Sequence, residues 1–239
     1  MQNIEIYSHR GASSAALENT WPAFRKACEL GVGIELDVQI TKDGVVLVFH
    51  DDDLKRLGGR NLRIEEIDYE KIKDLRIGKR GRRKFSADRI PLAYEVFHWA
   101  KEKSVPLNIE IKESFAVHSE GPEILAAMLE GLKNIHLSSF NAEILKEMKQ
   151  LKPEIETALV IKKKQKLQFL DKLTWVDGIH LHKRLYSEKL LIRLNDMKKK
   201  IRIYGIVGTE KVVKQPSRHL SGIITDYPGK IKEKMRLPD

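Results

Sequence analysis

The sequence has little cysteine, few aromatic residues and no long apolar run. One of its 239 residues is a cysteine and 7% are aromatic. Because Cys28 is alone, an internal disulfide framework and a thiolate metal cluster within the chain are excluded. No apolar stretch reaches the roughly 18 residues of a membrane-spanning helix, and Met1–Glu5 lacks the basic and apolar regions of a signal peptide. We therefore expect a cytoplasmic protein of a reducing compartment, without integral membrane association.

Acidic residues are outnumbered by basic ones. The chain has 44 Lys and Arg against 34 Asp and Glu, a formal net charge of +10. This excess favours an anionic partner and by itself leaves nucleic acid, a membrane surface and a small phosphate ester open. Basic residues gather within Gly78–Arg89 and at Lys162–Lys164 with Lys166, but no nucleic-acid-binding motif appears. A basic anion- or nucleic-acid-binding protein is the less favoured interpretation, and we expect no nucleic-acid partner.

Short apolar segments rich in β-branched residues alternate with segments of helical spacing. The predicted strands are Ile4–Ser8, Gly33–Ile40, Val45–His50, Pro106–Ile111, Ile135–Ser139, Glu156–Ile161, Gly178–Leu181, Ile201–Val207 and Gly222–Thr225. The predicted helices are Trp21–Leu30, Leu92–Lys103, Glu123–Leu132, Ala142–Leu151, Lys166–Leu173, Ser187–Lys198 and Gly229–Met235, with Asn19 or Thr20 as the cap of the first. This alternation predicts an α/β fold.

Two of the predicted strands are joined by a hairpin signal. Val45–His50 follows Gly33–Ile40 through Thr41–Gly44, which contains Asp-Gly, so we count the two as one barrel position with an extension. Eight positions then remain, and eight strand–helix units in a chain of this length predict a (β/α)8 TIM barrel in one domain, residues 1–239. An open doubly wound sheet is the alternative, but the chain lacks the glycine-rich phosphate-binding loops of such folds.

Residues 51–90 interrupt the alternation. The segment is polar, and six basic residues lie within Gly78–Arg89. Long segments without a regular pattern inside a compact domain usually carry a function. We predict a small insertion after the second strand, an inserted loop or small subdomain over the mouth of the barrel. A plain solvated loop is the alternative.

Paired carboxylates lie in two of the predicted strands. Glu35 and Asp37 stand at i and i+2 in Gly33–Ile40, so both side chains face the same way. Glu110 in Pro106–Ile111 repeats the pattern, and the apolar neighbours suit packing against helices, so the carboxylates point into the barrel. Three buried carboxylates repel one another unless a cation compensates their charge. Oxygen ligands favour Mg²⁺ or Ca²⁺, and we predict one divalent cation held by Glu35, Asp37 and Glu110.

Two basic side chains accompany these carboxylates. Arg10 follows the first predicted strand, and Lys112 stands two residues after Glu110. A metal-free ion-pair network neutralised by Arg10 and Lys112 is the alternative to a metal site. Beside a metal, the same two cations would hold the nonbridging oxygens of a phosphodiester.

Histidines stand at the ends of several predicted strands. His9 follows the first strand and His50 ends the extension of the second. Because reactive groups of such barrels lie at the carboxyl ends of strands, this pair indicates acid–base catalysis. His180 and His182 flank the end of another strand on one face, and His182 is the better placed to reach a pocket. Net charge, metal and paired histidines together indicate phosphoryl chemistry.

Ordered motifs along the whole chain carry a resemblance to a known family. They are His9-Arg10-Gly11-Ala12, Glu18-Asn19-Thr20 with Ala23-Phe24, Ile34-Glu35-Leu36-Asp37-Val38, Thr41-Lys42-Asp43-Gly44, His50-Asp51, Ile90-Pro91, Ile109-Glu110-Ile111-Lys112, Ser138-Ser139-Phe140 and Gly222-Ile223-Ile224-Thr225-Asp226-Tyr227-Pro228. With them the chain resembles the glycerophosphodiester phosphodiesterases of the bacterial cytoplasmic type. The resemblance implies a (β/α)8 barrel with a small insertion after the second strand.

The resemblance also implies a reaction. Such enzymes hydrolyse glycerophosphodiesters, such as glycerophosphocholine and glycerophosphoethanolamine, to sn-glycerol 3-phosphate and an alcohol. Carried over by position, Glu35, Asp37 and Glu110 would bind the metal, His9 and His50 would be acid and base, Arg10 and Lys112 would contact phosphate, and Glu18 would lie near the metal and the substrate glycerol. A lysophospholipase D on the same fold is the alternative. We expect a small anionic phosphodiester as the partner and a monomer or homodimer.

Three segments depart from the family pattern. Leu17 replaces the usual Pro before Glu-Asn-Thr, and Lys55–Gly59 replaces an Arg-Thr-Thr segment after His50-Asp51. The seventh barrel strand usually ends in a Trp-Thr-Val-Asn-like segment, whereas this chain has Ile203–Gly208 there, without Trp. Because that ring would line the pocket, its loss affects which alcohol the enzyme releases.

Overall fold

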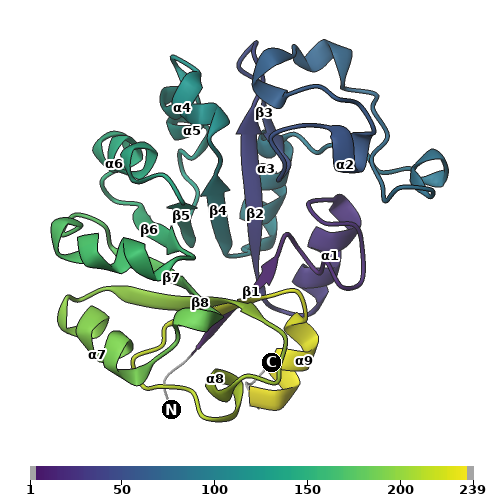
Figure 1. Ribbon diagram of the computed structural model, residues 1–239. Helices are drawn as coiled ribbons and strands as arrows, with labels where there is room; N and C mark the ends of the chain where they lie inside the picture. The colour runs from purple at the N-terminus through teal and green to yellow at the C-terminus, as the bar shows by residue number, and fades with distance from the viewer. Residues whose placement is uncertain (1–3, 236–239) are drawn as a thin grey trace.

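Eight parallel strands close into a ring (Figure 1). They are β1 (Glu5–His9), β2 (Gly33–Ile40), β4 (Leu107–Ile111), β5 (Ile135–Ser139), β6 (Glu156–Ile161), β7 (Gly178–His182), β8 (Lys200–Ile206) and β9 (Gly222–Thr225). The first strand pairs with both β2 and β9, which closes the barrel. The predicted TIM barrel is therefore confirmed. This computed structural model describes residues 4–235 apart from the side chain of Lys166, so residues 1–3 of the N-terminal segment discussed above lie outside the described residues.

Helices follow most strands and cover the outside of the ring. They are α1 (Trp21–Glu29), α3 (Ala93–Lys103), α4 (Ser114–Val117), α5 (Gly121–Met128), α6 (Ala142–Leu151), α7 (Glu188–Asp196), α8 (Lys211–Lys214) and α9 (Pro228–Met235), with short 3₁₀ helices η4 (Lys164–Lys172) and η5 (Lys183–Leu185). The predicted helix at residues 166–173 is thus a 3₁₀ helix. Among the described residues, no helix is both long and apolar enough to cross a membrane.

The caps of these helices follow their sequences only in part. Asn141 accepts hydrogen bonds from the backbone N–H groups of Glu143 and Ile144 at the start of α6, as capping residues do. Thr20 occupies the cap position of α1, but its hydroxyl donates to the carbonyl of Leu17 at 2.6 Å, so it gives no side-chain cap. Thr20 is therefore the cap residue of α1, as predicted, but without a side-chain bond to the helix.

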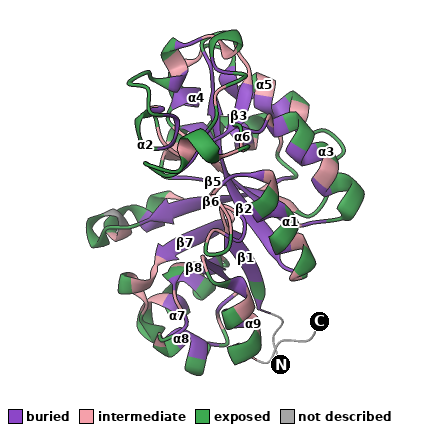
Figure 2. Cartoon of the chain, turned by 90° about the vertical axis from the view of Figure 1, so that its right-hand side faces the viewer, coloured by how far each residue is buried: buried purple, intermediate pink, exposed green. Residues whose placement is uncertain are grey.

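The apolar core lies between the ring and the helices. Ile34, Leu36 and Val38 on the outer face of β2 are fully buried, as is Phe24 of α1. Figure 2 shows the strands as buried and the outer sides of the helices as exposed. Since the apolar side chains of β2 are used on this outer face, its alternate positions point into the barrel and are free to be polar.

One short strand stands outside the ring. β3 (Val46–Val48) pairs antiparallel with the end of β2, with Val38 opposite Val48. The predicted Asp-Gly turn joins the two strands, and Gly44 has a φ of +81°, a conformation that favours glycine. This hairpin returns the chain to His50 at the mouth of the barrel.

The insertion after β3 has structure of its own. It contains α2 (Lys55–Gly58), η1 (Ile64–Glu66), η2 (Tyr69–Lys71) and η3 (Arg83–Phe85). An apolar cluster separate from the barrel core holds it together: Leu47, Phe49, Leu54, Leu57, Ile64, Ile67, Ile72, Ile77 and Ile90. The insertion is therefore more than a solvated loop, because it has buried apolar residues. The boundaries of a small subdomain at residues 51 and 90 stay a prediction.

Candidate active site

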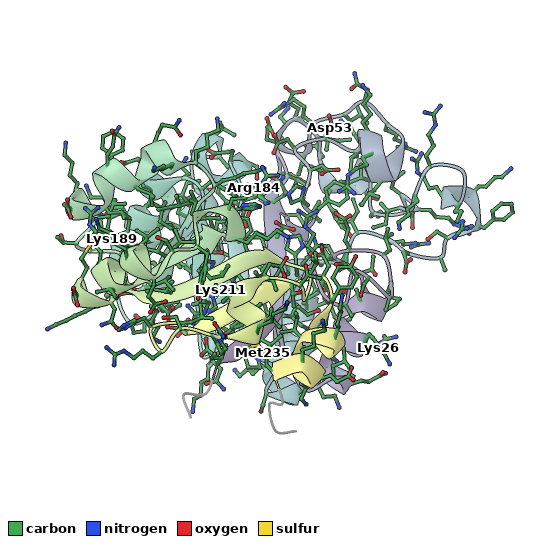
Figure 3. All side chains as sticks on the ribbon, turned by 60° about the horizontal axis from the view of Figure 1, so that its bottom comes forward. Lys26, Asp53, Arg184, Lys189, Lys211 and Met235 are labelled. Carbon is green, nitrogen blue, oxygen red and sulfur yellow. The ribbon has the colours of Figure 1, made fainter. Side chains whose placement is uncertain are left out.

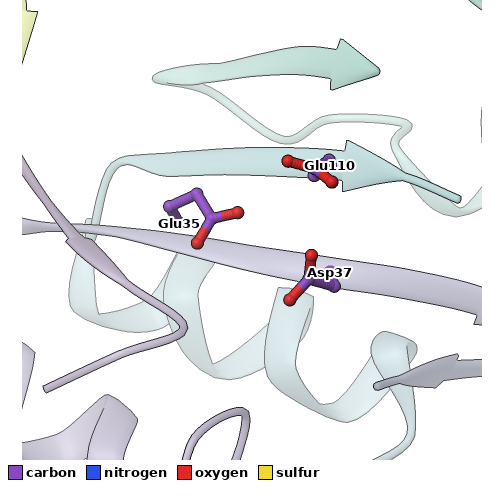
Figure 4. A group of neighbouring side chains, drawn as sticks. All are labelled: Glu35, Asp37 and Glu110. Atoms are coloured by element: carbon purple, nitrogen blue, oxygen red, sulfur yellow. The ribbon is translucent and has the colours of Figure 1, made fainter. Parts of the chain in front are cut away.

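Three carboxylates from two neighbouring strands converge inside the barrel. Asp37 of β2 is in register with Glu110 of β4, and Glu35 lies two residues before Asp37. Each of the three offers an oxygen, and these oxygens all lie within 4.8 Å of one another (Figure 4). Glu35 and Asp37 are 2% and 1% exposed. Burial, with repulsion from Asp37, raises the pKa of Glu35 to about 7.

Two cations lie against the centre of this cluster. The Nζ of Lys112 is 2.6 Å from one oxygen of Asp37 and also contacts Glu110, and the Nε of Arg10 is 3.3 Å from the other oxygen of Asp37. Burial opposes a charge on Asp37, but Lys112 and Arg10 hold its pKa well below the usual range. Asp37 therefore pairs with both cations that the sequence placed beside it.

The donor set nevertheless fits a hard divalent cation. Three carboxylates face two permanently charged side chains, Arg10 and Lys112, so a further cation would balance the charge of the cluster. The backbone N–H of Arg10 donates to one oxygen of Glu35 at 2.8 Å, which orients this carboxylate. Clustered carboxylate oxygens are the ligands that Mg²⁺ and Ca²⁺ take in proteins. Glu35, Asp37 and Glu110 are thus suited to hold such an ion.

A sharp turn after β1 places His9 and Arg10 beside the carboxylates. Arg10 and Gly11 have φ values of +56° and +77°. A Cβ on Gly11 would lie 2.8 Å from the backbone of Ala23, so only glycine fits this turn. Its glycine therefore lets the backbone N–H of Arg10 turn back onto Glu35.

His9 is oriented by a carboxylate from the other end of the chain. Its Nδ1 lies 2.6 Å from Asp226, which follows β9. Burial alone would lower the pKa of His9, but Glu35 and the hydrogen bond with Asp226 raise it. Since Nδ1 is engaged, Nε2 is the nitrogen available to a substrate. The sequence motif contains Asp226, but no role was assigned to it.

His50 has the same kind of support. Its Nδ1 lies 2.8 Å from Asp51, and Asp51 in turn accepts a hydrogen bond from the Nε of Arg56 at 2.7 Å. Burial opposes a charge on Asp51, but hydrogen bonds with His50 and Arg56 bring its pKa well below the usual range. Arg56 belongs to the segment that departs from the family pattern.

Glu18 is linked to the carboxylate cluster through Arg10, which contacts both Glu18 and Asp37. It pairs with Arg10 at 2.7 Å and with Arg56 at 2.6 Å. Its neighbour Asn19 donates from Nδ2 to Asp37 at 2.8 Å, which is the function of Asn19 in place of the predicted cap. The first loop thus fixes Arg10 and Asp37, and Arg56 connects that loop to the insertion.

A cavity of about 300 Å³ opens at the carboxyl ends of the strands. Its lining residues are His9, Arg10, Glu35, His50, Asn108, Glu110, Phe140, Val160, Lys162, His180, His182, Tyr204, Gly205, Ile224, Thr225 and Asp226. Five predicted site residues, and His182 as well, therefore surround one space. Asp37, Lys112 and Glu18 do not line it and support those that do.

Sequence patterns missed several of these lining residues. Phe140 and Lys162 each come directly after a barrel strand, so their position was the available signal. The Trp of the family pattern is absent from β8, but Tyr204 of that strand lines the cavity, with its ring centroid 5.1 Å from that of His182. An aromatic ring is therefore retained on this wall.

A larger cavity, about 570 Å³, opens at the opposite end of the barrel. Arg202 dominates it, is 1% exposed, and pairs with Glu5 at 2.8 Å and with Glu156 at 2.5 Å. These ion pairs neutralise the arginine and close the bottom of the barrel. The described residues that carry acid–base and metal-binding chemistry together lie at the other end, so the smaller cavity is the candidate active site.

The amino-acid sequence matches the profile of the Glycerophosphoryl diester phosphodiesterase family over residues 9–230. The chain belongs to this family. As a member of the glycerophosphoryl diester phosphodiesterase family it is a hydrolase of phosphodiesters. The family resemblance noted in the sequence is thereby confirmed.

Individual relatives agree with this membership. A glycerophosphodiester phosphodiesterase of Caldanaerobacter subterraneus subsp. tengcongensis is 36% identical over 162 residues, which cover 65% of this chain and 65% of that protein. The uncharacterised protein YqiK of Bacillus subtilis is 31% identical over 95% of this chain and 96% of its own length.

Solved structures of the family share the fold. A phosphodiesterase of Oleispira antarctica, in complex with the product sn-glycerol-3-phosphate, has a TM-score of 0.83 at 25% identity, over 97% of this chain and 96% of that one. The glycerophosphodiester phosphodiesterase of Thermotoga maritima has a TM-score of 0.77 at 25% identity, over 98% and 99% of the two chains.

Proposed function

We propose that this family member hydrolyses glycerophosphodiesters to sn-glycerol 3-phosphate and an alcohol, using one divalent cation, Mg²⁺ or Ca²⁺. The observation that carries the proposal is the meeting of Glu35, Asp37 and Glu110 beside a cavity that two histidines line. When bound to these carboxylates, the cation would supply Lewis-acid polarisation of the phosphoryl group.

The two basic residues would receive the phosphate in different ways, Arg10 by direct contact and Lys112 through its charge behind the carboxylates. Arg10 lines the cavity, and its guanidinium presents several donors to nonbridging oxygens. Lys112 lies behind Asp37 and Glu110 with 12% of its side chain exposed. Its proximity to Asp37 and Glu110 raises its pKa despite burial, so it stays charged and balances the carboxylates as the substrate's anion enters.

The two histidines would move the protons of an in-line displacement. One deprotonates the nucleophile and the other protonates the departing alkoxide. Each is held at Nδ1 by a carboxylate, His9 by Asp226 and His50 by Asp51, and each lines the cavity. The nucleophile is water or the neighbouring glycerol hydroxyl, and the second route passes through a cyclic phosphate.

A lysophospholipase D activity is the second candidate. The lining of the cavity includes the apolar or aromatic side chains of Phe140, Val160, Tyr204 and Ile224, and apolar side chains in a pocket favour an acyl chain. The human lysophospholipase D GDPD1 is 38% identical over 112 residues, which cover 44% of this chain and 35% of that protein.

Product release from a panel of diesters distinguishes these candidates. Purified protein is given glycerophosphocholine, glycerophosphoethanolamine, glycerophosphoglycerol and lysophosphatidylcholine, first with chelator and then with Mg²⁺ or Ca²⁺ restored. We expect metal-dependent release of sn-glycerol 3-phosphate, abolished by Glu35→Gln. Release of lysophosphatidic acid alone would favour the second candidate, and activity unaffected by chelator would contradict the metal site.

The cellular location that we propose is inferred from the amino-acid composition. One cysteine in 239 residues supports a reducing compartment, and the cytoplasm is our proposed location. A small anionic diester is its proposed ligand, and the monomer or homodimer stays a prediction.

A further inference from the structure

The insertion ends in a basic segment that projects from the molecule. We call residues 78–86 the basic tip; Figure 1 draws it as the blue loop farthest to the right, away from the barrel. Five of its residues are basic: Lys79, Arg80, Arg82, Arg83 and Lys84. The tip contains no acidic residue, so its charge is concentrated and of one sign.

An apolar ring stands among these cations. Phe85 is 79% exposed, more than Phe169 at 48% and Phe140 at 36%. The Nζ of Lys84 lies 5.2 Å from the centroid of the Phe85 ring. An aromatic ring beside lysine is the arrangement that side chains take at the boundary between water and lipid.

Arg83 of the tip has a structural role, whereas the other four basic residues are available to a binding partner. Arg83 donates from Nε to the carbonyl of Leu57 at 2.6 Å and from a terminal nitrogen to the carbonyl of Arg56 at 3.2 Å. These bonds fix the tip on α2. In the part of the chain that the structure describes, the other four cations form no ion pair with an acidic side chain.

The tip lies beside the first loop of the barrel. A cavity of about 550 Å³ separates the two, and its lining includes Lys79, Arg82 and Phe85 on one side and Ser13 to Leu17 on the other. The first loop continues into Glu18, which pairs with Arg10 at the active site. The first loop therefore connects the surroundings of the tip to Arg10 of the active site through Glu18.

We propose that the basic tip docks the enzyme on an anionic lipid surface. Phe85 enters the interface, while Lys79, Arg80, Arg82 and Lys84 face the lipid phosphates. Each cation near such a surface strengthens binding by roughly fivefold, so four cations and one ring give a measurable affinity. This docking is independent of which diester the site cleaves.

Nucleic acid fits the same charge less well. Single-stranded nucleic acid is bound by several aromatic rings along a groove, and the tip offers one. The major groove of DNA is entered by a helix or a two-stranded ribbon, whereas η3 is a 3₁₀ helix of three residues. Sequence-independent binding of DNA remains an outcome of the test.

Vesicle sedimentation tests the docking with the full-length protein and no substrate. The vesicles are phosphatidylcholine alone or a mixture with phosphatidylglycerol, at low and at physiological salt. One variant removes three tip charges, Arg80→Gln, Arg82→Gln and Lys84→Gln, and keeps Arg83. Its matched control removes three exposed charges elsewhere, Lys101→Gln, Lys103→Gln and Lys189→Gln. Figure 3 shows Lys189 on the opposite side of that view from Asp53 of the insertion.

We expect the unmodified protein and the control variant to sediment with anionic vesicles and not to sediment with neutral ones. The tip variant should lose roughly 100-fold in partition coefficient, since three cations are removed. Phe85→Ser should lose roughly tenfold or more. Equal binding by the tip variant and the control variant, with both folded by circular dichroism, would overturn the proposal.

Fluorescence locates the ring itself. In Phe85→Trp, the added emission should shift to shorter wavelength and be quenched by brominated lipid when anionic vesicles are present. The emission of the unmodified protein, from Trp21, Trp99 and Trp175, is the background to subtract. If the added emission keeps the wavelength that it has without vesicles, the proposal is overturned. Labelled DNA that binds the tip more tightly than the vesicles do also overturns it.

Discussion

The ammonium of Lys112 lies 2.6 Å from Asp37 inside the barrel and also contacts Glu110. One cation thus bridges two strands, β2 and β4, at the carboxylate cluster. Because Asp37 is 1% exposed, water cannot replace this partner. The ion pairs of Lys112 and the proposed metal site therefore share the same carboxylates. The net charge of the cluster with a divalent cation bound thus differs from its net charge without one.

Lys112→Gln tests this balance. It removes the cation between Asp37 and Glu110 and leaves Asp37 with Arg10 alone, and removing one partner of a buried pair costs about 3–5 kcal/mol. We expect the Tm in chelator to fall well below that of the unmodified protein. Added Mg²⁺ or Ca²⁺ should raise the Tm of the variant more than that of the parent.

Lys26→Gln is the control for that experiment. Lys26 pairs with Glu29 on the surface, where the side chains are 49% and 63% exposed, and such pairs contribute about 0–1 kcal/mol. If Lys112→Gln melted like Lys26→Gln in chelator, the charge argument would fail.

Both histidines of the cavity should be required for turnover. His9→Ala and His50→Ala should each lower kcat by roughly 10²- to 10⁴-fold, the range for general acid–base groups, while the melting curves stay close to that of the parent. His98→Ala is the control, since His98 is exposed on α3 and pairs with Glu102 on the same helix. Near-normal turnover in both cavity variants would remove the proposed roles.

Asp226→Asn should change the titration of His9. Burial lowers the pKa of His9, whereas Glu35 and Asp226 raise it, so removing the charge of Asp226 should lower it. NMR titration of the His9 ring measures this directly, and kcat should fall by less than in His9→Ala. Asp171→Asn, at an exposed pair with Arg193, should leave the titration unchanged. An unaltered pKa in Asp226→Asn would refute the positioning role.

Glu210 should make the fold sensitive to acid. Its carboxylate accepts the backbone N–H groups of Val207, Gly208 and Thr209 and pairs with Lys183 at 2.7 Å. Burial opposes its charge, but these bonds lower its pKa from 4.5 to about 2. A lowered folded-state pKa stabilises the fold above pH 4.5, and this contribution is lost as the pH falls through about 2.

Urea unfolding at several pH values measures this contribution. We expect Glu210→Gln to be less stable at neutral pH, by about 2 kcal/mol, and to lose less stability than the parent on acidification. Glu147→Gln, on the exposed face of α6, is the control. Parallel stability curves for parent and Glu210→Gln would contradict the assignment.

Local spacing determined much of the site in advance. The i, i+2 positions of Glu35 and Asp37 place both carboxylates on one face of any strand, and the alternation of strand and helix places that face inside a barrel. Strand ends and spacing likewise indicated His9, Arg10 and Lys112, and the family resemblance then implied their roles. The structure brings these residues together because each position depends on a period of two residues or on a strand end, which the local sequence encodes, while their catalytic and binding roles stay predictions.

Contacts between distant segments were decided by the tertiary structure alone. Asp226 reaches His9 across 217 residues because β9 closes the ring against β1. Arg56 reaches Glu18 because the apolar cluster of the insertion packs it over the first loop. Tyr204 keeps an aromatic ring in the cavity despite the altered motif, because its strand position points inward. Sequence thus determined which chemical groups are present and which face they share, while ring closure and packing decided their partners.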